Sequence, residues 1–454
     1  MKLSCVWAAI LAGGLWAQQP APMTIGQAVD SALRNYPSIR VSQEQMNAAA
    51  AGIRLAQTAY LPKVDGMAQV NRATRNTFYG LLLPQGVIPG VDGIRADNLG
   101  SVWDSGVGLL VTWQPFDFGL RRANVAAATA AEAQAQATIA RTRYDVSIAT
   151  ADAFLTVLAA QQTAQAARAA VDSWQILLRG IHALVSAELR PGADESRVQA
   201  EAALAETQLA RAEQAIAVAR ANVAKFVGVD PGQVDLAAGK LVDQLPPEAP
   251  AAALDARAHP AAREQGAAIA QEQSKLDSLA HTYRPQFVLQ GMAAARGTGL
   301  EVNGDRLGGP NGLAPNVQNY GVGLTVTFPF MDRFSLHEQE SAEAARIRAG
   351  RAQYQLIETN LHAQYNAAQA ELTGARQVAA KTPVGVSAAG AALAQATARY
   401  KSGLAPIDDV AQAQRLMVEA QIDDALARLS VWRALLAVDA TRGDIQPFLA
   451  EAGK

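Results

Sequence analysis

The sequence predicts a mainly α-helical chain that also carries part of a membrane β-barrel, built from a tandem structural repeat. Three observations lead to this fold class. A strand-like stretch occurs twice, as SGVGLLVTWQPFD at 105–117 and as NYGVGLTVTFPFMD at 319–332. An alanine-rich segment of roughly 70 residues follows each copy, which indicates a very long helix. The prolines that precede the strands also recur with a constant offset.

Both copies of the strand have one apolar face bracketed by aromatic residues. Trp103 and Trp113 bracket the first copy, and Tyr320 and Phe328 bracket the second. From Trp103 to Trp113 the strand spans roughly 33 Å, which at a tilt of about 45° covers about 24 Å of the ~25 Å apolar band of an outer-membrane barrel. We therefore expect these four residues to be membrane-interface aromatics. Alternation alone is equally typical of a sandwich strand with one buried face.

Composition and charge exclude some classes of function. The chain has 454 residues, a formal net charge of -2 and a pI of about 6.3, and its basic residues occur only in short groups such as Arg121-Arg122. Nucleic acid is therefore not an expected partner. Hydrophobic residues make up 50% of the chain but aromatic residues only 6%, and much of the remainder is alanine. This composition suits closely packed helices better than large aromatic cores.

The first residues, 1–17, have the features of a secretory signal peptide: one lysine, an apolar core and small residues. We expect cleavage after Ala17, which removes Cys5, the only cysteine. The mature chain is then expected to hold no disulfide and no lipid attached to cysteine. Since no later run of about eighteen apolar residues occurs, any membrane crossing is expected to use strands.

Proline positions define the two repeats. Pro37 and Pro62 flank a predicted helix, and Pro260 and Pro285 stand 223 residues further on in the same roles. The first repeat covers 18–231, with short helices, a β-hairpin at about 63–114 and long helices at about 118–189 and 194–227. A linker at 232–250 precedes the second repeat, 251–443, which has a helix, a hairpin at about 286–328 and long helices at about 334–400 and 407–442, followed by a C-terminal tail at 444–454.

Two hairpins supply four strands per chain, which cannot close a barrel. An open sheet edge in lipid leaves backbone groups unpaired at several kcal/mol each. Closure therefore requires several chains: about eight strands leave an interior filled by side chains, whereas about twelve leave a lumen. The long helices favour a wall of closely packed helices. The apolar stripe from Leu209 to Phe226 is also typical of an ordinary two-helix coiled coil.

Enzymatic functions are not indicated, and we expect no metal or cofactor. The five histidines, at 182, 259, 281, 337 and 362, show no metal-ligand spacing. The stretch closest to a nucleophile elbow, GVSAAG at 385–390, has one residue too many and lies in helical sequence. Pro383 predicts a kink or a bulge in the long helix expected at about 334–400.

Several motifs, in duplicate order, resemble the outer-membrane efflux proteins of the TolC type: TIGQAVDSALRNYP, AYLP, VTWQPFDFG, VTFPFMD and RYKSGLAPIDDVAQAQ. The resemblance covers nearly the whole mature chain. It implies a homotrimer with a barrel of about twelve strands, four per chain, in outer-membrane lipid, continuous with a long α-helical barrel through the periplasm. It also implies two protein partners, a periplasmic adaptor and an inner-membrane pump that supplies the energy.

The resemblance further implies a periplasmic gate at the second-repeat helix turn. Tyr400 and Asp409 match the tyrosine and the inward-facing aspartate that restrain the closed state, and Asp408 and Gln412 complete the predicted gate. Ala405 stands where an arginine would link to the neighbouring chain, and Gln412 stands where a second aspartate ring is expected. Closure by a charge-linked lock is therefore not predicted. For the two aspartates, helix capping and the helix dipole are an alternative reading.

Both helix turns are predicted to be adaptor-docking tips, with Leu189 and Gly192 at the first and Gly403 and Leu404 at the second. At the first tip the position expected to hold aspartate holds Arg197. The leading functional hypothesis is thus a passive export duct for an efflux or type I secretion system. A soluble periplasmic coiled-coil scaffold or adaptor is the alternative.

Overall fold

The computed structural model describes residues 22–248, with a gap at 75–100, and residues 253–453, with gaps at 300 and 302–304. The expected signal peptide and all of the segment 78–100, within the first expected hairpin, lie outside the described residues. The chain forms two compact units. We call one the helical unit, Met1–Val41, Ala140–Ala262 and Ile357–Lys454, and the other the sheet unit, Ser42–Ile139 and Arg263–Leu356.

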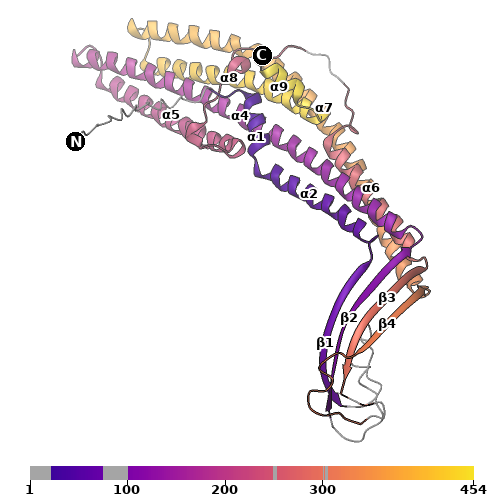
Figure 1. The fold of residues 1–454 in the computed structure, drawn as a ribbon. Coiled ribbons are helices and arrows are strands. Elements are labelled where there is room, and N and C mark those ends of the chain that lie inside the picture. Colours follow the sequence, from indigo (N-terminus) through magenta and orange to yellow (C-terminus); the bar gives the residue numbers. More distant parts are fainter. Residues whose placement is uncertain (1–21, 75–100, 249–252, 300, 302–304, 454) are drawn as a thin grey trace, which may run out of the picture. The chain divides into compact units, whose positions relative to one another are not determined.

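The sheet unit contains one antiparallel sheet of four strands in the order β1-β2-β3-β4 (Figure 1). The strands are β1 (Lys63–Thr74), β2 (Ser101–Phe116), β3 (Gln286–Thr298) and β4 (Val317–Thr327). The hairpin of each repeat therefore pairs with the other through β2 and β3, with Leu109 opposite Ala293. Within the described chain, β1 and β4 are the two open edges of this sheet.

The register places the alternating apolar residues of all four strands on one face. Val64 pairs with Val111 between β1 and β2, and Leu289 pairs with Leu324 between β3 and β4. This face is open in the single chain: Tyr320 is 87% exposed and Val322 is 80% exposed. Apolar side chains at such exposure require a non-aqueous environment or a partner.

The expected interface aromatics lie along this apolar face. Trp113 and Phe328 are exposed, and the Trp113 indole Nε1 donates a hydrogen bond to the carbonyl of Tyr60 at 3.1 Å. Trp103 is half-buried, and the guanidinium of Arg72 lies 5.2 Å from the centre of its ring. An indole with one polar contact and an apolar body is typical of the boundary between lipid and water.

Three helical segments pack together in the sheet unit. They belong to α4 (Leu120–Ser186), α6 (Pro260–Thr282) and α7 (Asp332–Lys401). The Thr138 hydroxyl of α4 donates to Glu264 of α6 at 2.7 Å, and Gln265 of α6 donates to the carbonyl of Gly350 on α7 at 3.1 Å. A Cβ on Gly350 would lie only 3.1 Å from Ile269, so glycine permits this close approach of α6 and α7. The unit also contains most of α2 (Pro37–Thr58).

The helical unit has the larger apolar core. It is built from α1 (Ile25–Asn35), the later part of α4, α5 (Gly192–Val227), α8 (Ile407–Arg442) and α9 (Gln446–Ala452). Trp432 and Phe448 are fully buried at its centre, with their rings 6.3 Å apart in an edge arrangement. α1 begins with a capping box in which Thr24 and Gln27 bond each other's backbone.

The structure refines several sequence expectations. The segment expected as a tail forms α9, and the linker holds two short 3₁₀ turns, Pro231–Gln233 and Gly239–Leu241. α7 is α-helical throughout with Pro383 inside it, so it contains no bulge at this residue, and the alternative expectation of a kink stays a prediction. Beside that proline, the Thr382 hydroxyl donates to Asp424 of α8 at 2.7 Å. None of the described helices is long and apolar enough to cross a membrane.

Candidate functional site

The candidate site is formed by the two helix turns of the helical unit. The first turn joins α4 to α5 and the second joins α7 to α8. In the first turn the Leu189 amide donates to the carbonyl of Leu184, and in the second the Leu404 amide donates to that of Arg399. The preceding residues, Glu188 and Gly403, have φ values of 60° and 74°. Both turns are therefore Schellman motifs of the same geometry.

This shared geometry corrects the sequence-based comparison of the turns. Gly192 and Gly403 are the predicted glycines of the two tips, but the structural counterpart of Gly403 is Glu188 and not Gly192. Pro191 and Pro406 then match as the residues that precede α5 and α8. With this alignment Arg190 is the counterpart of Ala405, and Asp194 is the counterpart of Asp409.

Tyr400 connects the two turns. Its side chain is buried, and its hydroxyl donates a hydrogen bond to the Asp194 carboxylate at 3.1 Å. Arg190 donates to the Tyr400 carbonyl at 2.7 Å, and its guanidinium lies 4.7 Å from the ring centre. Burial raises the pKa of Tyr400 above its usual value, and the hydrogen bond to Asp194 and its negative charge add to this, while Arg190 opposes it. The phenol is therefore a hydrogen-bond donor throughout the physiological pH range.

Two ion pairs lie beside this contact. Arg197 of α5 pairs with Asp408 of α8 at 3.0 Å, and Arg415 of α8 pairs with Glu201 of α5 at 3.4 Å. The first pair is well exposed on both sides, so its contribution to stability is small. In the second pair Glu201 is largely buried. The sequence interpreted Arg197 as a departure from a carboxylate pattern, and the structure gives it an acidic partner.

The remaining predicted gate residues lie apart from Tyr400. Asp409 and Gln412 are exposed on α8 in the single chain. Asp408 and Asp409 lie in the first turn of α8, where the helix dipole favours negative charge. The residue at the N-cap is Pro406, which has no side-chain capping bond, so the capping alternative for the two aspartates is wrong.

The predicted docking residues are at the surface of the turns. Leu189 is 70% exposed and Leu404 is 72% exposed, although each occupies a fixed position in its Schellman motif. Gly192 and Gly403 are also exposed. Below them, Tyr400 packs in an apolar cluster with Trp174, Val198, Ile407 and Val410. The turns therefore present exposed leucines on a rigid base.

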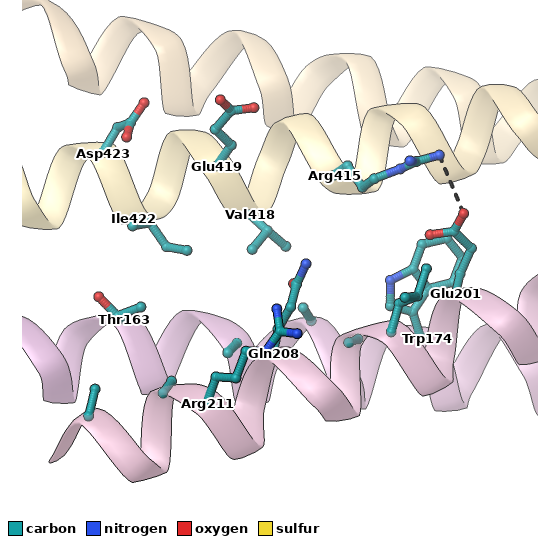
Figure 2. A pocket seen from close by; sticks show the side chains of 16 residues that line it. Thr163, Trp174, Glu201, Gln208, Arg211, Arg415, Val418, Glu419, Ile422 and Asp423 are labelled. Atoms are coloured by element: carbon teal, nitrogen blue, oxygen red, sulfur yellow. Dashed lines mark ion pairs between the residues drawn. The ribbon is translucent and has the colours of Figure 1, made fainter. Parts of the chain in front are cut away.

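A groove runs between α5 and α8, with α4 beneath it (Figure 2). Its volume is about 670 Å³. The buried Trp174 and several alanines form its floor, and the Arg415–Glu201 pair lies at one end, as Figure 2 shows. On the α8 wall, Val418 and Ile422 point toward Gln208 and Arg211 of α5, while the carboxylates of Glu419 and Asp423 point away from them (Figure 2). In the part of the chain that the structure describes, no group of three or more His, Cys, Asp or Glu side chains could hold a metal ion.

Comparison with known proteins gives a family and a set of structural neighbours. The family model for outer membrane efflux proteins matches residues 28–229 and 256–444. Comparison with curated protein sequences gave no match. The structure is similar to the outer membrane channel CmeC of Campylobacter jejuni, with 15% identity and a TM-score of 0.73 over 92% of this chain and 85% of that one.

Two further solved structures share the fold. The outer membrane protein VceC of Vibrio cholerae is 19% identical with a TM-score of 0.70, covering 92% of this chain and 96% of that one. The MtrE outer membrane channel of Neisseria gonorrhoeae, solved in its open state, is 17% identical with a TM-score of 0.71, covering 92% of this chain and 89% of that one. At these identities the likeness concerns the fold, which is mostly helical with a four-stranded antiparallel sheet in this chain.

Proposed function

Because this chain belongs to the outer membrane efflux protein family, and is thus an outer-membrane protein that extends into the periplasm, we propose that three copies form a passive export duct. The observation that carries the proposal is the open four-stranded sheet with its exposed apolar face. Edge strands β1 and β4 have unpaired backbone groups, which are costly in lipid. Pairing β4 of one copy with β1 of the next satisfies them, and three copies give a barrel of about twelve strands with a lumen.

The proposal is tested by mass and conductance. The full chain, purified from outer membranes in mild detergent, is expected to have the mass of a trimer and to produce discrete current steps in planar bilayers. Insertion as a trimer without any conductance, in the wild type and in gate variants alike, would contradict the duct. Recovery of the native protein in the soluble periplasmic fraction would favour the coiled-coil scaffold instead.

We further propose that the paired turns form the periplasmic gate, with Tyr400 as its central residue. Its hydrogen bond to Asp194 supports this role because it joins α7 to α5 within one copy. Tyr400→Phe removes only the hydroxyl, so it is expected to raise the conductance of the resting channel while the trimer remains intact. Tyr354→Phe, a half-buried tyrosine on the same long helix, is the matched control.

Asp409 and Gln412 are proposed to face the axis of the trimer near the gate. Three carboxylates around a narrow entrance attract cations. Asp409→Asn is therefore expected to lower the preference for potassium over chloride, and Gln412→Asp is expected to raise it. Reversal potentials in a salt gradient measure both. Asp408→Asn, at the neighbouring gate position, is expected to change the preference less, because the Asp408 carboxylate is paired with Arg197. An unchanged reversal potential in Asp409→Asn would place that residue outside the ion path.

The exposed leucines of the two turns are proposed as contacts for a periplasmic adaptor that links the duct to an energised inner-membrane pump. Leu189, Gly192, Gly403 and Leu404 are all exposed, and the leucines are the apolar residues among them. Leu189→Asp and Leu404→Asp are expected to abolish export in cells while trimer assembly stays normal. Ile176→Asp, at an exposed position of α4 away from the turn, is expected to leave export unchanged.

A further inference from the structure

The two repeats differ at one position of the paired turns. When the Schellman motifs are superposed in sequence, the residue after the exposed leucine is Arg190 in the first turn and Ala405 in the second. The arginine that is missing from the second turn is thus present in the first. The two sites are not equivalent, because Arg190 reaches Tyr400 of α7 within the same copy.

Arg190 holds Tyr400 in two ways. One guanidinium nitrogen donates to the backbone carbonyl of Tyr400 at 2.7 Å, and the same carbonyl also accepts the Gly403 amide at 3.0 Å. The planar guanidinium also lies over the aromatic ring, with Cζ 4.7 Å from its centre. Asp194 holds the hydroxyl at the opposite end of the same side chain. Arg190 of the first turn therefore binds both the backbone and the ring of Tyr400.

The predicted docking residue Leu189 and the residue that holds Tyr400, Arg190, are neighbours in the chain. Arg190 directly follows Leu189, whose side chain is 70% exposed, and directly precedes Pro191 at the start of α5. Pro191 has a fixed φ and restricts Arg190 to extended backbone conformations, so the chain between Leu189 and α5 has little freedom to absorb a displacement of Leu189. A partner that moves Leu189 would pull the guanidinium away from Tyr400.

We propose that Arg190 is a latch that couples contact at the first turn to release of Tyr400, so that one turn both receives the adaptor and locks the gate. This proposal depends on the gate proposed above and describes how that gate is regulated. Arg190 is a positioning residue, because it acts by holding Tyr400 against Asp194. Opening then requires loss of the carbonyl bond and of the ring contact together.

The first test measures the resting channel. Arg190→Ala, in the full-length protein, is expected to raise the open fraction about tenfold or more, since a charge-assisted hydrogen bond and a cation–π contact are both lost. Arg190→Lys keeps a positive charge over the ring but loses the planar guanidinium, so its open fraction is expected to lie in between. Arg179→Ala, an exposed arginine of α4, is the matched control. Trimer mass and circular dichroism confirm folding.

The second test separates coupling from simple support of the turn. In a Cys5→Ser background, Leu189→Cys is labelled with a bulky maleimide, which mimics displacement by a partner. Labelling is expected to open the channel when Arg190 is present and to add nothing when Arg190→Ala is combined with it. A label on Ile176→Cys, at an exposed position of α4, is expected to have no effect in either background.

The outcomes distinguish the latch from the duct and the gate. If Tyr400→Phe opens the channel while Arg190→Ala stays as closed as the wild type, the gate stands and the latch is wrong. Equal opening by the label with and without Arg190 also overturns the latch. If no variant conducts despite correct trimer insertion, the duct fails and the latch with it.

Discussion

Glu188 and Gly403 occupy the same left-handed position in the two helix turns, with φ values of 60° and 74°. Glycine adopts this backbone conformation freely, whereas a residue with a Cβ pays roughly 1–2 kcal/mol for it. The first turn therefore carries local strain that the second does not. Such strain persists only where the surrounding contacts hold it, and here the neighbouring Arg190 supplies two of those contacts.

Removing this strain should stabilise the first turn. Glu188→Gly is expected to stabilise the folded protein by about 1 kcal/mol, reduced somewhat by the greater freedom of glycine in the unfolded chain. Gly403→Ala is the reciprocal change and is expected to destabilise the folded protein by about 1 kcal/mol, because alanine is strained at a φ of 74°. The added Cβ itself meets only an ordinary contact, at 3.9 Å from Arg190. Thermal unfolding in detergent compares them. Destabilisation by Glu188→Gly would show that the glutamate side chain has a stabilising role.

Glu272 of α6 and Glu343 of α7 are neighbouring carboxyl groups in the sheet unit. Each has one buried oxygen with no hydrogen-bond partner, and the other oxygens are bonded by Lys275 at 3.0 Å and Arg346 at 2.7 Å. A proton on one carboxyl lets it donate to the other, which satisfies both buried oxygens. The hydrogen bond to Glu272, followed by burial, raises the pKa of Glu343 above its usual value of 4.5. The same hydrogen bond, helped by Lys275, lowers the pKa of Glu272. We infer that the folded pair holds one proton, on Glu343.

This proton makes stability depend on pH. For a carboxyl whose folded pKa is raised, the contribution is full below the unfolded pKa of 4.5 and is lost as pH rises through the folded pKa. Glu343→Gln keeps a donor at every pH, so its melting temperature is expected to exceed that of the wild type increasingly from mildly acidic to alkaline pH. Glu338→Gln, exposed on the same helix, is the control. A parallel pH profile for the wild type and Glu343→Gln would contradict the shared proton.

His259 is predicted to make the helical unit sensitive to acid. It is buried, its Nδ1 accepts a hydrogen bond from the amide of Ala261 at 3.1 Å, and its ring contacts Tyr144 edge-on. Burial, together with the charge of Arg141, lowers its pKa below the usual 6.5, against opposing effects of the Ala440 backbone and Asp145. The native state therefore binds this proton less readily than the unfolded state does, and stability falls as pH drops below the ordinary histidine range.

The corresponding experiment replaces His259 with a residue that can still accept a hydrogen bond at the start of α6 but does not take up a proton. His259→Asn is expected to flatten the loss of melting temperature between about pH 7 and pH 5, because asparagine accepts from a helix N-terminus but does not take up a proton in this range. His337→Asn, at an exposed position, is expected to leave the loss unchanged. If His259→Asn loses stability in acid as steeply as the wild type, the acid sensitivity arises elsewhere.

Local sequence signals were sufficient for the order and most bounds of the elements. α8 begins and ends where the sequence places it, at Ile407 and Arg442, because Pro406 and Gly443 are strong local boundary signals. α9 was missed because seven residues do not form a stable helix alone, and burial of Phe448 against Trp432 supplies what propensity does not.

The contacts of the candidate site were harder to predict. Tyr400 was identified from the resemblance, but its partners Asp194 and Arg190 lie on the other repeat, 206 and 210 residues away. Alanine-rich helices give few sequence signals to show which turn of one helix packs against which turn of its neighbour. Aligning Pro191 with Pro406 would have placed Arg190 opposite Ala405 from sequence alone. The contact with Tyr400 depends on tertiary packing of α4 and α5 against α7 and α8, which no local pattern encodes.

The two faces of the sheet should respond oppositely to a charge if the apolar face meets lipid. Val322 is 80% exposed in the middle of β4, on the face that holds Leu109 and Leu324, whereas Asn319 lies on the opposite face. Arginine on a lipid-facing strand position costs about 2–4 kcal/mol at the membrane midplane. Val322→Arg is therefore expected to reduce the yield of folded trimer in the outer membrane sharply. Asn319→Arg is expected to assemble normally and to shift ion selectivity toward anions. Normal assembly of Val322→Arg would mean that this face is covered by protein rather than lipid, and the barrel arrangement proposed here would have to be abandoned.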